Sequence, residues 1–520
     1  MSEALLTDTG TTADLFRHAC LRYGDRTLLS WPGGAITYAD FAREVAAMAE
    51  AMRALGVKRG QGVSFLAGNR PDILIATYAA QSLGARTSAL HPIGGEADHR
   101  FVIEDSQTTL LLYCERDFAE RASALEHSCA GLKVAPFGKR SGNGLSTLAV
   151  PHLGCPWRIE AEPTDISRLS YTGGTTGKPK GIVHRHRSNV MAAVLTRVAW
   201  DWPTDARFLS VTPLSHASGT MFLPVAIQGG MMHVGPRFTP KAFAQEARNE
   251  RITCTFLVPT QMLRILDEPD LDVDAVRAIE TILYGAAPTS PARLAQWLER
   301  FGHNLVQLYG QAESPNCFTV LPRHMHEATR PERLASCGIA NIGLDVRVLD
   351  ADNNPVPDGE TGELCARGPS IMEGYWHRPE ETERTLAGGW LHSGDLARRD
   401  ADGFFYLVGR AKDMIITGGF NVYPKEIEDV IATDPAVEAV AVIGVPDEAW
   451  GEAVKAIIVP RPGAAFDSER IIAAVKAAKG SVAAPKSIEI AEDIPLTPLG
   501  KPDKVALRAR YWQGQDRGVA

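Results

Sequence analysis

The sequence predicts a large α/β protein with parallel sheets, a β-rich subdomain and a small, mobile α+β C-terminal domain. Three observations support this prediction. The 520 residues exceed what one hydrophobic core holds together. Alternating strand and helix patterns fill the first two-thirds of the chain, and such units form parallel sheets covered by helices. After about residue 340 the pattern changes to short alternating strands separated by Pro, Gly and Asp turns.

The first strand–helix units are read from periodicity and end signals. Thr37 and Asp40 suit a helix start of the capping-box kind, and Gly56 suits its end. The apolar positions between them recur every three or four residues: Phe41, Val45, Met48, Met52 and Leu55. Short strands are predicted at 63–67 and 87–90, with a helix between them. Further strands are predicted near 208–212, 254–258 and 281–284.

The C-terminal part divides into two predicted regions. Residues of about 340–410 form the β-rich subdomain, which completes an N-terminal domain of residues 1–410. Residues 411–520 form the small C-terminal domain. It begins with a strand at 413–416 and continues with a helix at 424–431, strands near 437–444 and 453–459 and a helix from Ser468.

Composition excludes several classes of protein. The net charge of −8 without a long basic run argues against nucleic-acid binding. Eight scattered cysteines without a CxxC pair argue against a zinc site or a disulfide framework. No apolar stretch reaches the ~20 residues of a membrane span, and the N-terminal segment lacks the pattern of a signal peptide. We therefore expect a cytoplasmic protein, as a monomer or a homodimer.

The most informative segment is a glycine- and threonine-rich loop. Its predicted phosphate-binding residues are Thr172, Gly173, Gly174, Thr175, Thr176, Gly177, Lys178 and Lys180. Glycines let backbone N–H groups approach phosphate oxygens, hydroxyl groups donate hydrogen bonds, and lysines add positive charge. The loop is not a GxxxxGK[ST] loop, because three residues separate its glycines and Pro179 takes the Ser/Thr place. The alternative reading is a flexible surface turn.

The loop and seven further motifs resemble the adenylate-forming superfamily of acyl-CoA synthetases, carrier-protein adenylation domains and firefly luciferase. The motifs follow the family's order along the chain. They are Pro213–His216, Tyr284–Pro288, Tyr309–Glu313, Trp390–Asp395, Gly409–Asp413, Gly418–Pro424 and Leu499–Lys501. Two positions depart from the family pattern: Gly173 replaces a serine, and Ala312 replaces a threonine.

The resemblance implies a nucleotide site. Glu313 takes the position of the magnesium-contacting acid. The alternative is a solvated loop glutamate, which the surrounding Tyr-Gly-x-x-Glu pattern disfavours. The backbone of Gly285, Ala286, Ala287 and Pro288 and the segment Tyr309, Gly310, Gln311 and Ala312 are expected beside the adenine and phosphates. Asp395 takes the position that accepts both ribose hydroxyls, with Arg410 as the matching donor; a structural ion pair is the alternative for these two.

The resemblance also implies a catalytic cation and a moving domain. Lys501 is expected to reach the reacting carboxylate and the bridging oxygen as negative charge develops. Lys412 takes the hinge position about which the C-terminal domain swings. Gly418, Gly419 and Phe420 are expected to line the pantetheine channel for CoA in the second pose.

The acyl pocket is expected among residues 216–222, 284–287 and 309–315. His216 takes the position of a gate beside it, and Gly219, Thr220, Gly285 and Ser314 are predicted to line it. The small residues suggest space for a medium-to-large or bulky acid. His184 and His186 follow the phosphate loop and are expected to cap or solvate a helix start.

The sequence therefore predicts an ATP-dependent carboxylic acid:CoA ligase that forms an acyl-adenylate and then a thioester. Its expected ligands are a small carboxylic acid, ATP, Mg²⁺ and CoA. One alternative is an adenylating enzyme that loads a carrier protein or another thiol. A light-emitting oxidase has no specific support. A nucleotide-binding homologue without catalysis is disfavoured, because it would be expected to lack Lys501 or Glu313.

Overall fold

The computed structural model describes residues 10–138, 144–172, 179–448, 450–496 and 502–512. Backbone contacts divide the chain into two compact units. Of the described residues, the first unit comprises those within 10–172, 179–346 and 367–391, and the second comprises those within 347–366 and 392–512. Both units are of mixed α/β composition, which confirms the predicted fold class. The domain boundary at residue 410 remains a prediction.

The largest sheet of the first unit is mostly parallel. Its strands, in spatial order, are β15 (Ile339–Ala340), β14 (Ser314–Leu321), β13 (Leu305–Gln311), β12 (Thr281–Gly285), β11 (Cys254–Leu257), β9 (Arg207–Ser210), β10 (Met231–Val234), β1 (Thr27–Trp31) and β2 (Gly34–Thr37). The neighbours from β13 to β1 run parallel, and antiparallel strands close both edges. Parallel strands end at the same edge, so the residues after β12 and β13 meet there.

A second sheet of this unit carries the strands that flank the phosphate loop. Its order is β18 (Gly374–Tyr375), β8 (Lys180–Arg185), β7 (Ile166–Thr172), β4 (Arg86–Ala89), β3 (Gly62–Leu66), β5 (Thr108–Tyr113) and β6 (Lys133–Pro136). The part from β7 to β6 is parallel, whereas β7–β8 and β8–β18 are antiparallel. β3 and β4 confirm the predicted strands to within one residue.

Helices of the first unit cover these sheets. Those near its N-terminal end are α2 (Thr12–Tyr23), α3 (Tyr38–Ala54), α4 (Pro71–Ser82), α5 (Glu96–Asp105), α6 (Glu115–Ser128) and α7 (Leu145–Ala149). Later ones are α8 (His186–Ala199), α9 (Ala217–Ile227), α10 (Pro240–Asn249), α11 (Pro259–Leu266), α12 (Val273–Arg277), α13 (Pro291–Phe301), α14 (Pro331–Leu334) and α15 (Pro379–Thr385). Helix α3 starts as predicted, with the Thr37 side chain accepting from the Asp40 backbone N–H.

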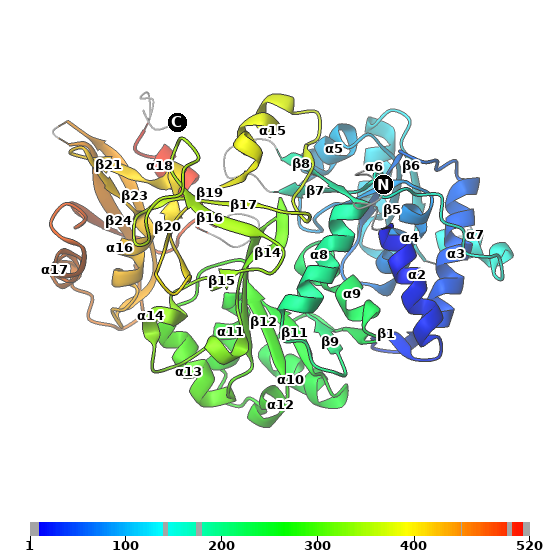
Figure 1. Ribbon diagram of the computed structural model, residues 1–520, viewed down its shortest axis with the longest axis horizontal. Helices are drawn as coiled ribbons and strands as arrows, with labels where there is room; N and C mark the ends of the chain where they lie inside the picture. The colour runs from blue at the N-terminus through cyan, green and yellow to red at the C-terminus, as the bar shows by residue number, and fades with distance from the viewer. Residues whose placement is uncertain (1–9, 139–143, 173–178, 449, 497–501, 513–520) are drawn as a thin grey trace. The chain divides into compact units, whose positions relative to one another are not determined.

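Four aromatic rings form the centre of the first unit's core. Phe16 of α2 stacks on Tyr78 of α4 at 4.3 Å between ring centroids and meets Phe41 of α3 at 5.1 Å and Phe222 of α9 at 5.3 Å. All four rings are buried. Helices α2, α3 and α4, drawn in blue, therefore pack around a shared centre with α9 (Figure 1).

The second unit contains two antiparallel sheets. One has the order β16 (Asp345–Leu349), β17 (Gly362–Arg367), β19 (Leu391–Arg399) and β20 (Phe405–Arg410). The other has the order β22 (Phe420–Val422), β21 (Ile415–Thr417), β24 (Gly451–Pro460) and β23 (Val437–Asp447), and β25 (Ser487–Ile490) pairs with β24. Helices α16 (Pro424–Ile431), α17 (Ser468–Lys479) and α18 (Lys504–Ala509) complete the unit. Strand β21 starts two residues later than predicted, because Ala411–Asp413 forms a short 3₁₀ turn.

Two expectations about individual residues have clear outcomes. Seven cysteines are free, and all of them but Cys155 are buried: Cys20, Cys114, Cys129, Cys155, Cys254, Cys337 and Cys365. The expectation that His184 and His186 cap or solvate a helix start is wrong in its solvent part. His186 does begin α8, but both rings are fully buried, and the Nδ1 atom of His186 lies 2.8 Å from the Thr12 hydroxyl. Across the described residues, no helix is long and apolar enough to cross a membrane.

The buried histidines predict a loss of stability in acid. Burial lowers the pKa of His186 and of His326 to about 4, from the ordinary value of 6.5. The unfolded chain therefore takes up protons first, so stability is complete above pH 6.5 and falls as the pH decreases towards 4. At pH 5 each histidine costs about 2 kcal/mol. Unfolding free energies measured between pH 7.5 and 5 should show this slope, and His326→Gln should reduce it.

The matched control is His127→Gln, on an exposed part of α6. An unchanged slope in the His326→Gln protein, or an equal reduction in the control, would contradict the assignment.

Candidate functional site

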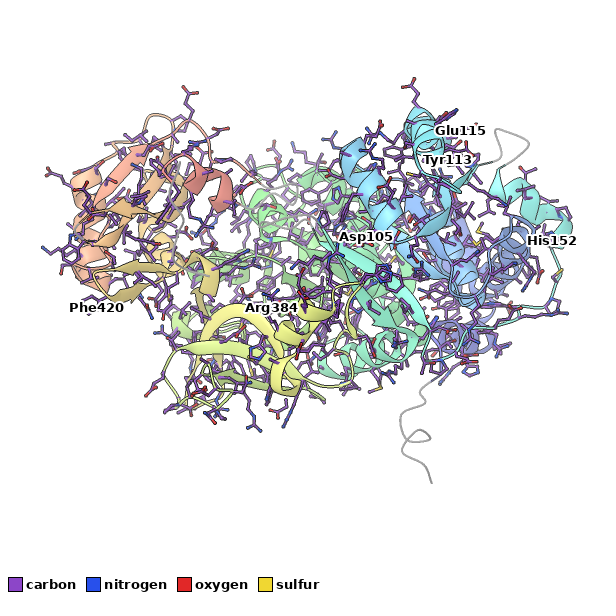
Figure 2. The ribbon with its side chains drawn as sticks, turned by 90° about the horizontal axis from the view of Figure 1, so that it is seen from above. Asp105, Tyr113, Glu115, His152, Arg384 and Phe420 are labelled. Carbon is purple, nitrogen blue, oxygen red and sulfur yellow. The ribbon has the colours of Figure 1, made fainter. Side chains whose placement is uncertain are left out.

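The two strands that flank the phosphate loop are held in register. Thr172, the last residue of β7, pairs with Lys180, the first residue of β8. The Tyr171 hydroxyl donates to Asp105 Oδ2 at 2.7 Å, and the Trp376 indole donates to the Asp105 backbone oxygen at 2.9 Å. Asp105, labelled in Figure 2, thus ties β7 to the segment that follows β18. The predicted phosphate-binding residues 173–178 lie outside the described residues.

Glu313 lies in the turn between β13 and β14, where two hydrogen bonds hold it in place. Its backbone oxygen accepts from the Met372 N–H at 2.8 Å, and its side-chain Oε1 accepts from the Tyr375 hydroxyl at 2.9 Å. Burial and the neighbouring Glu313 carboxylate raise the pKa of Tyr375, so the hydroxyl keeps its proton and remains the donor.

Tyr375 also connects Glu313 to the phosphate loop. It stands in β18, which pairs with β8 so that Tyr375 lies opposite Ile182. The Lys180 ammonium lies 5.3 Å from the centroid of the Tyr375 ring and forms an ion pair with Glu381. The structure therefore brings a predicted acid and a predicted lysine to the same tyrosine, although they are far apart in the sequence.

The predicted adenine-binding segments are adjacent at the sheet edge. Gly285 ends β12 and lies beside Leu308 of β13, and a Cβ atom on Gly285 would overlap the Leu308 backbone oxygen. Ala286 follows with a positive φ of 70°, which turns the chain sharply into Ala287 and Pro288. Tyr309 and the adjoining Gly310 and Gln311 belong to β13, and the Tyr309 ring contacts Phe318 edge-on at 5.7 Å.

His216 precedes helix α9 in a loop that Asn69 fixes. The Asn69 amide donates to the Thr212 oxygen at 2.9 Å and accepts from the Leu214 N–H at 2.8 Å. The His216 ring contacts the Ser215 hydroxyl through Nδ1 at 2.8 Å and the His91 ring at 4.9 Å. Burial, with a smaller effect of neighbouring charges, lowers the pKa of His216 to about 4. The imidazole is therefore neutral near pH 7.

A cavity of about 150 Å³ lies in the first unit between α4, α8, α9 and strands β3, β4 and β7. Tyr78, Phe222 and Trp200 supply aromatic surface. Gly219 and Thr220, both predicted for the acyl pocket, line it, whereas His216, Gly285 and Ser314 are not among its lining residues. A Cβ atom on Gly219 would overlap the Leu214 backbone oxygen, so the helix start itself requires this glycine.

The predicted ribose-binding pair is brought together in the second unit. Asp395 of β19 lies opposite Arg410 of β20, and Arg410 Nε donates to Asp395 Oδ1 at 3.1 Å. The Asp395 side chain is 12% exposed and that of Arg410 is 44% exposed. The carboxylate is thus oriented by its partner while the guanidinium still reaches solvent.

The predicted hinge and channel residues come directly after β20 in the chain. Lys412 lies in the turn after β20. Burial lowers its pKa, and the nearby positive charge of Arg410 lowers it further. Gly418 and Gly419 form the two-residue turn between β21 and β22, with φ of 57° and 80°. Phe420 begins β22 and is 59% exposed at the edge of its sheet (Figure 2). Lys501 lies outside the described residues.

Sequence reasoning missed three residues that the structure places in or beside these groups: Tyr375, Asn69 and Arg168. Tyr375 and Asn69 act through contacts between segments distant in the chain, which no local pattern reveals. Arg168 had one signal, because it is a charged residue in the middle of β7, between the buried residues Ser167 and Leu169.

Comparison with known proteins places the chain in a family. The profile of AMP-binding enzymes matches residues 16–376, and that of the AMP-binding enzyme C-terminal domain matches residues 426–501. The chain belongs to the AMP-binding enzyme family, the adenylate-forming enzymes that its motifs resemble.

Similar proteins match over nearly the whole chain. A medium/long-chain-fatty-acid–CoA ligase of Mycobacterium tuberculosis is 42% identical, with 96% of this chain and 90% of that protein covered. A feruloyl-CoA synthase of an Amycolatopsis species is 36% identical, with coverages of 92% and 94%. Among solved structures, the amide bond synthetase McbA of Marinactinospora thermotolerans superposes with a TM-score of 0.87 at 29% identity, covering 96% of this chain and all of that one. ATP-bound MatB of Rhodopseudomonas palustris gives 0.88 at 26%, with coverages of 96% and 99%.

Proposed function

We propose that the protein is an ATP-dependent carboxylic acid:CoA ligase. It joins an acid to ATP as an acyl-adenylate with release of pyrophosphate, and then transfers the acyl group to CoA with release of AMP. The observation that carries this proposal is the shared contact of Glu313 and Lys180 with Tyr375, which collects an acid and a cation at the phosphate loop. Similarity to acid–CoA ligases over nearly the full chain supports it.

The first half-reaction brings two anions together, so the site must supply positive charge and donors. The loop from Thr172 to Lys180 supplies backbone N–H groups, hydroxyls and lysines to the phosphates. Within the described ranges no lysine or arginine forms an ion pair with Glu313, so no such cation competes with Mg²⁺ for its carboxylate oxygens. Magnesium would neutralise phosphate charge when bound, with Glu313 as the residue that would hold it.

The nucleoside and the acid are held by the remaining groups. The adenine lies against Tyr309 and the strained turn at Gly285–Ala286, and the ribose hydroxyls bind Asp395 and Arg410. The acid enters past His216 into the cavity beside Gly219 and Thr220. Because His216 is neutral near pH 7, it neither attracts nor repels the substrate carboxylate by charge.

The second half-reaction uses the turn between β21 and β22. Rotation about Lys412 brings Gly418, Gly419 and Phe420 to the pantetheine arm. Because the two glycines have no side chains, they leave a narrow passage for the arm.

The cavity favours a medium-to-large acid, and the cytoplasm supplies ATP and CoA. A carrier protein is the alternative acceptor, since a fatty acid–[acyl-carrier-protein] ligase of Streptomyces coeruleorubidus is 30% identical.

Pyrophosphate release from ATP, measured over a panel of carboxylic acids with and without CoA, tests the proposal. We expect acid-dependent release from the wild-type protein and almost none from Lys501→Ala, because the cation that neutralises the developing charge is gone. Thioester formation from a preformed acyl-adenylate should remain nearly unchanged in Lys501→Ala. Release without any added acid, or unchanged release from the variant, would contradict the proposal.

The Tyr375 contact predicts a second, smaller effect. Tyr375→Phe removes the donor to Glu313, which should slow acyl-adenylate formation about tenfold and raise the magnesium concentration required. Rates of pyrophosphate release at several magnesium concentrations measure both. The control is Tyr406→Phe, which removes a hydrogen bond of the same 2.9 Å length to Asp400. Equal effects in the two variants would show a loss of stability rather than of Glu313 positioning.

A substitution in the turn between β21 and β22 should affect only one of the two half-reactions. Gly419→Leu should spare acyl-adenylate formation and slow transfer to CoA by an order of magnitude or more, about 1.4 kcal/mol. A side chain at position 419 would meet open space, but the positive φ of this residue adds strain. Gly463→Leu is therefore the control, because Gly463 has a φ of 76° and also faces open space. Equal loss of both half-reactions in Gly419→Leu would refute the channel role.

A further inference from the structure

We propose that Arg168 makes the cavity a subsite for the far end of an acid that carries a second oxygen acceptor, a second carboxylate above all. The inference rests on the proposed function and specifies its substrate class. It follows from the position of Arg168, from its lack of partners and from the lining around it.

Arg168 stands in the middle of β7, and its side chain lines the cavity. The neighbouring wall is largely apolar, with Phe65, Leu74, Met221 and Phe222 among its members. The strand runs on from Arg168 to Thr172, and four residues at about 3.3 Å each place Arg168 roughly 13 Å before the phosphate loop begins. That separation suits the far end of an acid whose reacting carboxylate lies at the loop.

The guanidinium of Arg168 has no hydrogen-bond or ion-pair partner within the described ranges, and its Nε atom is fully buried. The polar groups next to it are already used. The Asn189 amide donates to the Ser167 hydroxyl at 2.7 Å, and the Thr87 hydroxyl donates to the Ser167 backbone oxygen at 3.0 Å. A buried N–H donor of a cation that lacks a partner is costly, so a ligand oxygen that accepts from it gains that free energy on binding.

The charge of Arg168 persists at neutral pH and acts on its surroundings. Burial lowers its pKa only to about 10, so it remains protonated. The pKa of His184 is lowered mainly by burial and next by this positive charge. The pKa of His216 is lowered mainly by burial, next by His91 and then by Arg168. Among the residues that line the cavity, Arg168 is therefore the one that carries a charge. Since a guanidinium only donates, the recognised group must be an acceptor, and a carboxylate pairs with it best.

Arg86 shows what a structural arginine looks like in the same sheet. It stands in β4, next to β7, and is buried, and its guanidinium donates to the Ser106 backbone oxygen at 2.8 Å and to the Gly60 backbone oxygen. These bonds tie loops of the fold together. Arg168 makes no such bonds with the described residues, so a structural role does not account for it.

The test compares octanoic acid, ω-hydroxyoctanoic acid and octanedioic acid, with matched six- and ten-carbon series to find the best length. In the wild-type protein, kcat/KM for the dicarboxylic acid should exceed that for the methyl-ended acid by at least about tenfold. Arg168→Met should lower it by roughly 10- to 100-fold, mainly through KM, and leave octanoic acid unchanged or improved. Arg168→Lys should keep part of the preference.

Arg86→Met is the matched control, expected to lower stability without changing the order of preference. Equal kcat/KM for the three wild-type substrates, or equal losses for all of them in Arg168→Met, would overturn the inference. Calorimetric binding of octanedioate and octanoate gives a readout independent of turnover. Arg168-dependent binding without pyrophosphate release would contradict the proposed function but support the subsite. Release without any dependence on Arg168 would do the reverse, and neither binding nor release would contradict both.

Discussion

The antiparallel pairing of β7 with β8 is the constraint on which the rest of the site depends. It sets Thr172 opposite Lys180, and it gives β18 an edge to pair with, so that Tyr375 reaches Glu313. The same strand directs Arg168 into the cavity. A shift of one residue in this register would turn every side chain of β8 to the other face and separate these contacts.

Much of the fold and part of the site could be predicted from the sequence. Thr37 and Asp40 indicate a helix start through local hydrogen bonds, and the strand predicted near 281–284 is β12. Contacts between distant segments could not be predicted, because Tyr375 meets Glu313 only after two sheets have formed. The burial of His186 was missed for the same reason, since its environment comes from α2 and not from its own neighbours.

The predicted nucleotide-binding residues are distributed over the two compact units. Glu313, Tyr309 and Lys180 belong to the first, whereas Asp395 and Arg410 are fixed by a β-hairpin of the second. Each unit thus holds its own share rigidly through backbone pairing.

The glycine at position 219 limits how the acyl cavity can evolve. Its hydrogen is all that fits beneath the Leu214 carbonyl, so any larger residue would distort the first turn of α9 and, with it, the loop that carries His216. Divergence towards other acids must therefore proceed through side chains that project from α4 and from later in α9, such as Thr77 and Met221. Natural variation in acid preference among close relatives should be concentrated at those positions, with the helix entrance left intact.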